Sequence, residues 1–134
     1  MRAIEFSSGK FPPYLPEDCQ VNPGAYGFEL AAWLSRALVG KGVVTSYPVS
    51  EDWGWFIEYL PETGEELLIG CASEAAEGEG FGGQPLNWRI FVRTRKKPDK
   101  RLIKAGAPDS TGLIMNAILS VLAAEGIEAK QAEG

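Results

Sequence analysis

The chain has 134 residues, of which 45% are hydrophobic and 23% are charged, and this is typical of one globular domain spanning residues 1–134. No apolar run reaches the roughly 18 residues that a membrane-spanning helix needs, and the first residues lack the apolar stretch of a signal peptide. We therefore predict a cytoplasmic protein with no membrane partner. Cys19 and Cys71 lie far apart, which predicts two reduced thiols and neither a zinc site nor a disulfide framework.

Charge is distributed unevenly within a net charge of −5. Residues 1–88 carry four basic side chains against thirteen acidic ones, whereas residues 89–104 carry eight against one. An acidic surface repels nucleic acid and speeds association with basic partners. We predict a basic protein partner and no nucleic acid partner. The segment 89–104 is a phosphate-binding stripe, a solvated sheet edge or an internal partner for the acidic part of the chain, and the negative total favours the solvated edge over the stripe.

The first predicted elements are a short strand and a helix. Residues 2–7 favour a strand, and the loop over residues 11–16 holds three prolines, which lack the amide donor that a central strand needs. Asn22 and Pro23 are typical of the N-cap and first position of a helix, and Gly40 provides a stop. The predicted helix spans about residues 23–39, and its apolar side chains recur at three- and four-residue steps, so one face packs on the core.

Four strands are predicted next. They span residues 43–49, 53–60, 66–73 and 87–95. The sequence Pro61-Glu62-Thr63-Gly64 predicts a hairpin turn that makes the second and third of these strands antiparallel neighbours. In the last strand, Trp88, Ile90 and Val92 alternate with arginines and Phe91, which predicts one dry face and one wetter face.

A second helix completes the predicted elements. It begins at Pro108-Asp109-Ser110-Thr111, carries a broad apolar stripe and ends before Gly126, and the tail after about residue 127 is expected to be frayed. The order strand, helix, four strands, helix predicts an α+β two-layer sandwich. Its sheet has four to five mostly antiparallel strands, and both helices pack on one face. One parallel pair formed by a crossover stays open as an alternative.

The search for catalytic motifs finds mainly absences. The sequence has no histidine, which removes Ser-His-Asp and Cys-His arrangements and most zinc sites. Residues 78–83 satisfy the pattern G-x-G-x-x-G, but Pro85 and a predicted strand follow where a nucleotide site needs a helix. The acid pairs 17–18, 51–52 and 65–66 suit solvated loops better than a metal or acid–base site. We predict no catalytic residue, no cofactor, no metal and therefore no enzyme.

The stretch Glu51-Asp52-Trp53-Gly54-Trp55-Phe56 joins two carboxylates to three aromatic rings where a predicted loop becomes a strand. Trp53 and Trp55 share one predicted strand phase; Trp55 is expected in the core, whereas Trp53 is either an exposed anchor ringed by acids or simple edge packing. The connection over residues 75–86 is either an acidic docking loop or a solvated one. The residues predicted to bind a partner are Glu51, Asp52, Trp53, Glu74, Glu77 and Glu79.

Parts of the chain resemble a group of small, free-standing bacterial proteins. The residues that carry the resemblance are Val21-Asn22-Pro23-Gly24, Tyr26-Gly27, Glu29-Leu30-Ala31, Trp33-Leu34 and Glu51-Asp52-Trp53-Gly54-Trp55. Some members of the group look like immunity proteins of contact-dependent growth inhibition systems, which bind and block a cognate toxin domain inside the cell. The likeness covers roughly the first half to two thirds of the chain. It implies a toxin-neutralising function, and it carries over neither a catalytic residue nor a contact residue.

Three functions therefore stand side by side. The first is an intracellular immunity protein that blocks a toxin domain, such as a nuclease, through an acidic surface. The second is a small binding or scaffold module with a ligand at the sheet edge or between helix and sheet. The third, ranked last, is an enzyme in which Glu58 or Glu66 converges on Asp52.

Overall fold

A computed structural model describes residues 2–107 and 109–133, and it has the predicted α+β architecture with six strands in place of four to five. The strands are β1 (Arg2–Ser8), β2 (Val49–Glu51), β3 (Gly54–Tyr59), β4 (Glu66–Glu74), β5 (Leu86–Lys96) and β6 (Lys130–Glu133). The helices are α1 (Phe28–Val39) and α2 (Ser110–Ala124), and three short 3₁₀ turns, η1 (Glu17–Cys19), η2 (Glu79–Phe81) and η3 (Lys100–Leu102), lie in loops.

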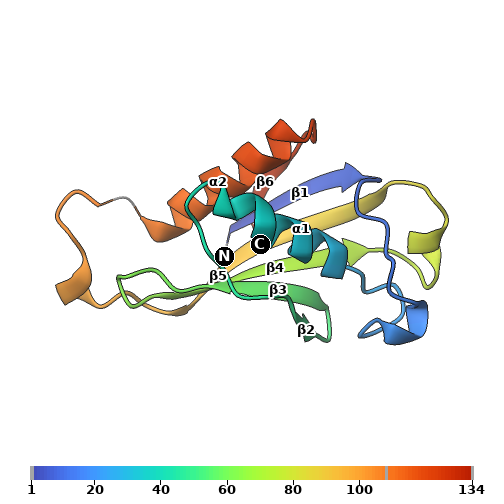
Figure 1. Ribbon diagram of the computed structural model, residues 1–134, viewed down its shortest axis with the longest axis horizontal. Coiled ribbons are helices and arrows are strands. Elements are labelled where there is room, and N and C mark those ends of the chain that lie inside the picture. The colour runs from blue at the N-terminus through green and yellow to red at the C-terminus, as the bar shows by residue number, and fades with distance from the viewer. Residues whose placement is uncertain (1, 108, 134) are drawn as a thin grey trace.

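The sheet has the strand order β2-β3-β4-β5-β1-β6, and every neighbouring pair is antiparallel. Both helices lie over the same face of this sheet (Figure 1). The alternative of a mixed sheet with a parallel pair is therefore wrong. Helix α1 connects β1 to β2, which is the edge strand on the opposite side of the sheet. Three strands separate β1 from β2, so the two do not pair.

The main core fills the space between the sheet and the helices. Its members from β5 are Leu86, Trp88, Ile90 and Val92, of which the last three are those that the alternation predicted, and α2 contributes an almost continuous apolar face. The hairpin turn at residues 61–64 joins β3 to β4 as predicted. Both cysteines are free thiols, and in the described part of the chain no helix combines the length and apolar character needed to cross a membrane.

Helix α1 begins five residues later than predicted. Asn22 and Pro23 belong to a turn, in which the Asn22 side chain donates to the backbone oxygen of Asp52 at 2.6 Å and does not cap a helix. Gly24 and Gly27 follow with φ of 76° and 148°, which helical residues do not adopt. A Cβ at Gly24 would also lie 2.4 Å from the backbone oxygen of Ala75, so this turn is held against the loop after β4.

The predicted strand over residues 43–49 is also wrong. Only Val49–Glu51 pairs with β3, and the preceding residues run beside it through the Ser46 amide, which donates to the backbone oxygen of Glu58 at 2.9 Å. Pro48 lies between these two contacts and has no amide to donate, so the ladder is interrupted there.

The tail predicted to be frayed instead forms β6, which pairs with residues 2–5 of β1. The predicted helix start at Pro108 lies outside the described residues. Its neighbour Asp109 is the N-cap of α2, with a side chain that accepts from the Gly112 amide at 3.1 Å.

The face of the sheet turned away from the helices, which we call the open face, carries a second small cluster. Phe91 and Phe56 are only 7% and 4% exposed there, packed with Ala3 and Leu68. The Phe91 ring lies over Gly70, where a Cβ would approach it to 2.2 Å, so only glycine leaves room for the ring. This cluster explains why Phe91 is buried on the face that the sequence predicted to be wetter.

Candidate functional site

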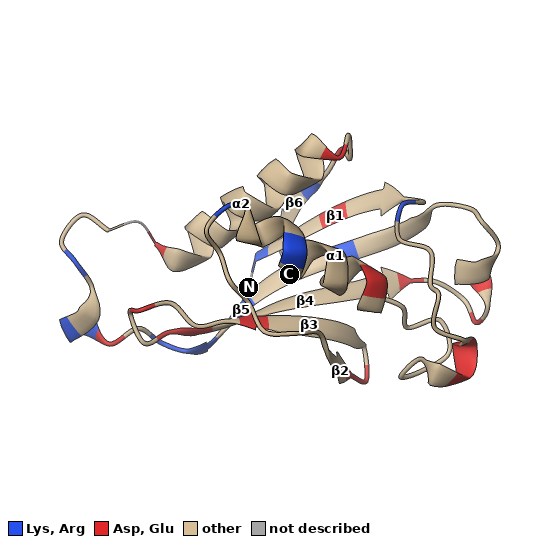
Figure 2. Ribbon diagram, viewed as in Figure 1, with Lys and Arg blue, Asp and Glu red and all other residues tan. Residues whose placement is uncertain are grey.

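The structure gathers many of the exposed carboxylates at one end of the sheet, where β4 ends and β5 begins (Figure 2). They come from three separate segments: η1, the end of β2 with the turn after it, and the end of β4 with the loop after it. We call this group the acidic end; its members are Glu17, Asp18, Glu51, Asp52, Glu74, Glu77 and Glu79.

The loop between β1 and α1 ties the three segments together. Its Asn22 holds the backbone of Asp52 in the β2–β3 turn, as described above. Its Glu17 accepts hydrogen bonds from the Gly24 amide at 2.9 Å, from the Tyr26 hydroxyl at 2.7 Å and from the Gly78 amide at 3.2 Å. Because Gly78 belongs to the β4–β5 loop, one carboxylate joins both loops of the acidic end.

These contacts also set the ionisation of Glu17. Partial burial acts to raise the pKa of Glu17, and the three hydrogen bonds from Gly24, Tyr26 and Gly78 outweigh it, so the pKa lies below its usual value. Burial and the bond to Glu17 raise the pKa of Tyr26. Glu17 is therefore a charged acceptor at neutral pH, a role that the sequence did not reveal because its partners are 7 to 61 residues away.

The last residues of β4 complete this scaffold. The Ser73 hydroxyl accepts from the Tyr26 amide at 3.0 Å and donates to the backbone oxygen of Gly24 at 2.8 Å. A Cβ at Gly80 would meet the Tyr26 ring at 2.8 Å, so η2 lies directly on that ring. The glycine-rich loop 78–83 thus serves packing, and a strand follows it, as the sequence predicted.

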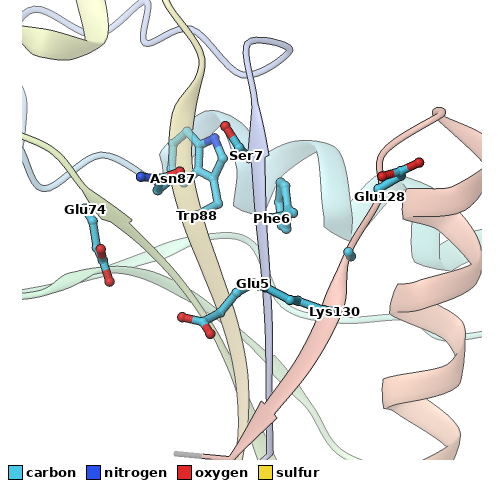
Figure 3. A pocket seen from close by; sticks show the side chains of 9 residues that line it. Glu5, Phe6, Ser7, Glu74, Asn87, Trp88, Glu128 and Lys130 are labelled. Carbon is cyan, nitrogen blue, oxygen red and sulfur yellow. The ribbon is translucent and has the colours of Figure 1, made fainter.

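A shallow hollow of about 640 Å³ adjoins the acidic end on the side of β1 and β6 (Figure 3). Glu74 belongs to both features. The other polar side chains that line the hollow come from β1, β5 and the segment leading into β6: Glu5, Ser7, Asn87, Glu128 and Lys130.

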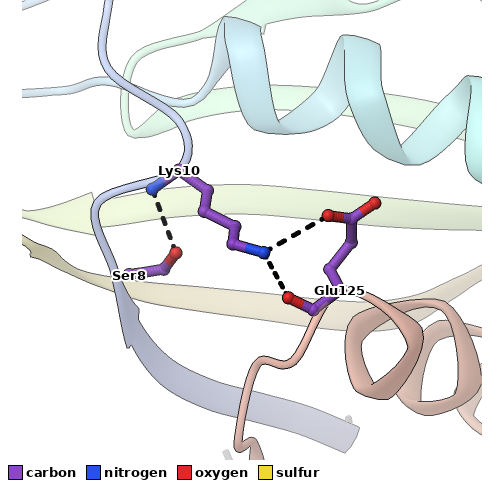
Figure 4. Close-up of polar contacts among 3 residues, drawn as sticks. All are labelled: Ser8, Lys10 and Glu125. Carbon is purple, nitrogen blue, oxygen red and sulfur yellow. Dashed lines mark hydrogen bonds and ion pairs between the residues drawn. The ribbon is translucent and has the colours of Figure 1, made fainter.

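The lysine of the loop between β1 and α1 pairs with a residue outside the acidic end. Lys10 donates its backbone amide to the Ser8 hydroxyl at 3.1 Å, and its ammonium contacts the backbone oxygen and, at 3.4 Å, the carboxylate of Glu125 (Figure 4). Glu125 is the C-cap of α2, where a helix favours positive charge. Arg89 pairs with Glu5 at 3.5 Å. Among the described residues, no lysine or arginine makes an ion pair with a member of the acidic end.

The structure brings five of the six predicted partner-binding residues into the acidic end. Glu51, Asp52, Glu74 and Glu77 are exposed, whereas Glu79 is half-buried and accepts from the Ala76 amide at 2.9 Å.

Trp53 lies elsewhere, because it belongs to the turn before β3 and packs on the open face with its ring 4.9 Å from that of Phe91. The prediction that Trp53 shares a phase with Trp55 is wrong. Trp55 packs against the main core, as expected.

Exposed aromatic rings accompany these carboxylates, and sequence reasoning missed them. Tyr14 is 69% exposed and meets Phe28 edge-on at 5.9 Å between ring centroids, and Phe81 is 48% exposed and meets Tyr26 at 6.0 Å. Tyr14 lies three residues before Glu17 in the chain, and Phe81 ends η2 and packs on Tyr26, whose hydroxyl donates to Glu17. The signal in the sequence was the presence of aromatic residues in loops, and it does not separate Tyr14 and Phe81 from the loop residues Phe11 and Tyr26, which are buried in the core.

One buried acid lies beneath this surface. Glu29 is 6% exposed in the first turn of α1, and one of its carboxylate oxygens accepts from the Tyr14 amide at 3.2 Å. Burial raises the pKa of Glu29 above its usual value and outweighs the backbone hydrogen bonds that lower it. Glu29 is buried although it is charged, because the proline-rich loop folds over it and donates the Tyr14 amide to its carboxylate.

The carboxylates of the third hypothesis do not converge. Trp55 pairs with Cys71, which is five residues along β4 from Glu66, or about 17 Å, and Asp52 lies beyond Trp55. Glu58 is three residues from Trp55 along β3, or about 10 Å, again in the direction away from Asp52. Within the described ranges, no group of three or more Cys, Asp or Glu side chains is placed to hold a metal ion.

The basic segment 89–104 begins on β5 and extends past its end, so most of it lies at the pole opposite the acidic end. On the open face, the Arg93 and Arg95 guanidinium groups lie over the rings of Phe91 and Phe56 at 5.4 Å and 6.0 Å. These arginines cover aromatic rings that a nucleic acid base would need to stack on. The contacts favour a solvated surface for this segment, but its predicted position at a sheet edge is wrong, because β5 lies between β4 and β1.

Comparisons with models of protein families, with curated protein sequences and with solved structures give no match. The fold and the acidic end therefore carry the functional argument.

Proposed function

We propose that this protein is an intracellular immunity protein that binds a cognate toxin domain and blocks it with its acidic end. The toxin surface it covers is basic, as in the cleft of a nuclease, where phosphate-binding lysines and arginines gather. Such a protein acts in the cytoplasm of the cell that makes it. The sequence resemblance to immunity proteins of contact-dependent growth inhibition systems supports the same class.

The observation that carries the proposal is the composition of the acidic end. Seven carboxylates come from three segments, which are held together by Asn22 and by one of the seven, Glu17, and Lys10 in the same loop as Glu17 pairs with Glu125. Charge of one sign on a rigid surface raises the association rate with an oppositely charged partner and rejects partners of like charge. A scaffold fixed before binding also loses little entropy in the complex.

The exposed rings of Tyr14 and Phe81 supply apolar anchor contacts, which the carboxylates cannot make. Tight interfaces depend on a few aromatic anchors surrounded by polar residues that exclude water. Tyr14 is exposed in the segment just before η1, and Phe81 is exposed in the β4–β5 loop, so both rings belong to segments that carry the carboxylates. Charge would thus set the rate of encounter, and the rings would set the lifetime of the complex.

The hollow beside β1 and β6 favours one alternative, a small binding module with its ligand at the sheet edge. The two functions differ in their partner. An immunity protein forms one tight complex with a toxin that is lethal when produced alone, whereas a binding module needs no toxin.

Co-expression with the protein encoded immediately upstream tests the proposal. We expect the neighbouring protein to kill the cell when produced alone, the pair to permit growth, and the two chains to copurify. A matched variant in which Tyr14 and Phe81 are both changed to alanine should protect less well, and changing the exposed Tyr47, which lies away from the acidic end, should leave protection unchanged. A neighbour that is harmless alone and does not copurify would contradict the proposal.

A further inference from the structure

The hollow beside the acidic end contains a row of polar side chains that the sequence did not connect. Glu74 of β4 pairs in register with Asn87 of β5, and Asn87 pairs with Ser7 of β1. All three side chains project from the open face, because their strand neighbours Trp88 and Phe6 project into the main core. Figure 3 shows Glu74 and Asn87 side by side on their strands.

The spacing of the row follows from sheet geometry. Side chains directly opposite each other on neighbouring strands have Cβ atoms about 5 Å apart, so the row from Glu74 to Ser7 spans about 10 Å. Glu128 lines the hollow on its far side, next to the start of β6. A ligand group lying along the row therefore meets a carboxylate at one end, an amide in the middle and a hydroxyl beyond it.

The polar groups of the row are available for a ligand. In the part of the chain that the structure describes, the side chains of Ser7, Glu74 and Asn87 make no hydrogen bond to other residues. Ser8, the neighbour of Ser7, is by contrast engaged by Lys10. Each of the three groups offers an acceptor oxygen, and Glu74 adds a negative charge.

The two cationic residues near the hollow, Arg89 and Lys130, lie in register with Glu5, two residues along β1 from Ser7. Arg89 and Lys130 are the register partners of Glu5 on either side, and Arg89 forms an ion pair with Glu5 at 3.5 Å. Arg89 is therefore drawn toward Glu5 and away from Glu74. The hollow consequently has a negative wall at Glu74 and Glu128 and a largely compensated wall at Glu5.

A planar cation with several donors fits this arrangement better than a compact one. A guanidinium group carries five N–H donors in a fixed fork, so it can address a carboxylate and a neighbouring amide oxygen together, whereas an ammonium acts as a point charge. The volume of the hollow, about 640 Å³, accommodates an arginine side chain with space for its flanking residues.

We propose that the hollow is the receptor for one arginine side chain presented by a protein partner, with Glu74 and Asn87 binding the guanidinium group. The inference rests on the proposed function in taking the arginine to belong to the toxin domain. It deepens that function, because it extends the contact surface from the acidic end onto the open face and names the side chain that the partner must supply. Specificity then depends on the polar row as well as on charge.

A titration with small probes tests the receptor without a toxin. Isotope-labelled protein is titrated with Nα-acetyl-arginine methylamide and, as the matched uncharged probe, with the corresponding citrulline derivative, while amide resonances are followed by NMR. We expect the arginine probe to shift the resonances of Ser7, Glu74 and Asn87, and the citrulline probe to leave them nearly unchanged. Glu74→Gln should weaken the arginine probe about tenfold, since it removes a charge-assisted hydrogen bond.

Glu66→Gln is the control, because it removes the same charge from the opposite end of the same strand. Shifts that lie elsewhere, equal shifts from both probes, or equal weakening by Glu74→Gln and Glu66→Gln would overturn the receptor. If the protein encoded immediately upstream does not kill the cell when produced alone, the proposed function is wrong, but the result of the titration still holds. The two failures are therefore distinguishable.

Discussion

The carboxylate of Glu17 joins two of the three segments that build the acidic end, so its removal should loosen that end more than the removal of its neighbour Asp18. Glu17→Ala deletes three hydrogen bonds at once, to Gly24, Tyr26 and Gly78. A hydrogen bond to a charged group contributes about 1.5–3 kcal/mol when shielded from water. Glu17 is only half-buried and water replaces part of each bond, so we expect a total loss of about 2–4 kcal/mol in the free energy of unfolding.

The assay is urea unfolding followed by tryptophan fluorescence, combined with hydrogen exchange in residues 75–82. Asp18→Ala is the matched control, because Asp18 is adjacent and exposed and makes no side-chain hydrogen bond among the residues described. We expect the Gly78 amide to exchange faster in Glu17→Ala than in the wild type, and to exchange at the wild-type rate in Asp18→Ala. Equal unfolding free energies for the two variants, within about 0.5 kcal/mol, would refute the role assigned to Glu17.

The pH dependence of the folding stability is a second test of the role of Glu17. The pKa of Glu17 in the folded protein lies below its usual value of 4.5, so its stabilising contribution is complete above that pH. The contribution is lost as the pH falls through the folded pKa. The difference in stability between the wild type and Glu17→Gln should therefore shrink in acid, and a difference that grows in acid would contradict the sign of the shift.

Three further predictions concern other parts of the fold. Glu29→Gln should raise the urea midpoint at pH 7 and have little effect below pH 4.5. Burial raises the pKa of Glu29, so the stability that the protonated carboxyl group allows is lost as the pH rises through its pKa in the folded protein. A lower midpoint at pH 7 would contradict this. Gly70→Ala should lower the free energy of unfolding by about 1–3 kcal/mol, since the new methyl group meets the Phe91 ring at 2.2 Å. The control Gly40→Ala, at a φ of −64°, should have little effect. Equal effects of the two variants in chemical unfolding would count against the packing described. Deleting residues 128–134 should lower the melting temperature and speed hydrogen exchange along β1, and an unchanged exchange pattern would mean that β6 contributes nothing.

The sheet was predictable where its signal is local. The alternation in β5 and the turn at residues 61–64 placed β3, β4 and β5 within about one residue of their observed bounds. β6 was missed because Lys130–Glu133 has no apolar run of its own, and it forms because the edge of β1 offers unpaired backbone groups. The start of α1 was missed because Asn22 has a stronger competing partner in Asp52.

The acidic end was predictable only in part. Exposed acids in a turn and a long loop identified most of its members from the sequence. What brings them together is a set of long-range contacts, chiefly those of Asn22, Glu17 and Ser73, that have no local signature. The same reason explains why Tyr14, Phe81 and the row from Glu74 to Ser7 were missed, because each depends on which loops and strands become neighbours.

The most direct test of the proposed function compares two charge reversals of equal size. In one variant Glu51, Asp52 and Glu77 become lysine; in the other Glu58, Glu62 and Glu66, away from the acidic end, become lysine. The measurement is the dissociation constant for the toxin domain that copurifies with the wild type, at two salt concentrations. We expect the first variant to bind at least a hundredfold more weakly, as the loss of about 3 kcal/mol of charge complementarity requires, and the second to bind nearly as the wild type does. Equal affinities for the two variants would contradict an acidic-end inhibitor surface.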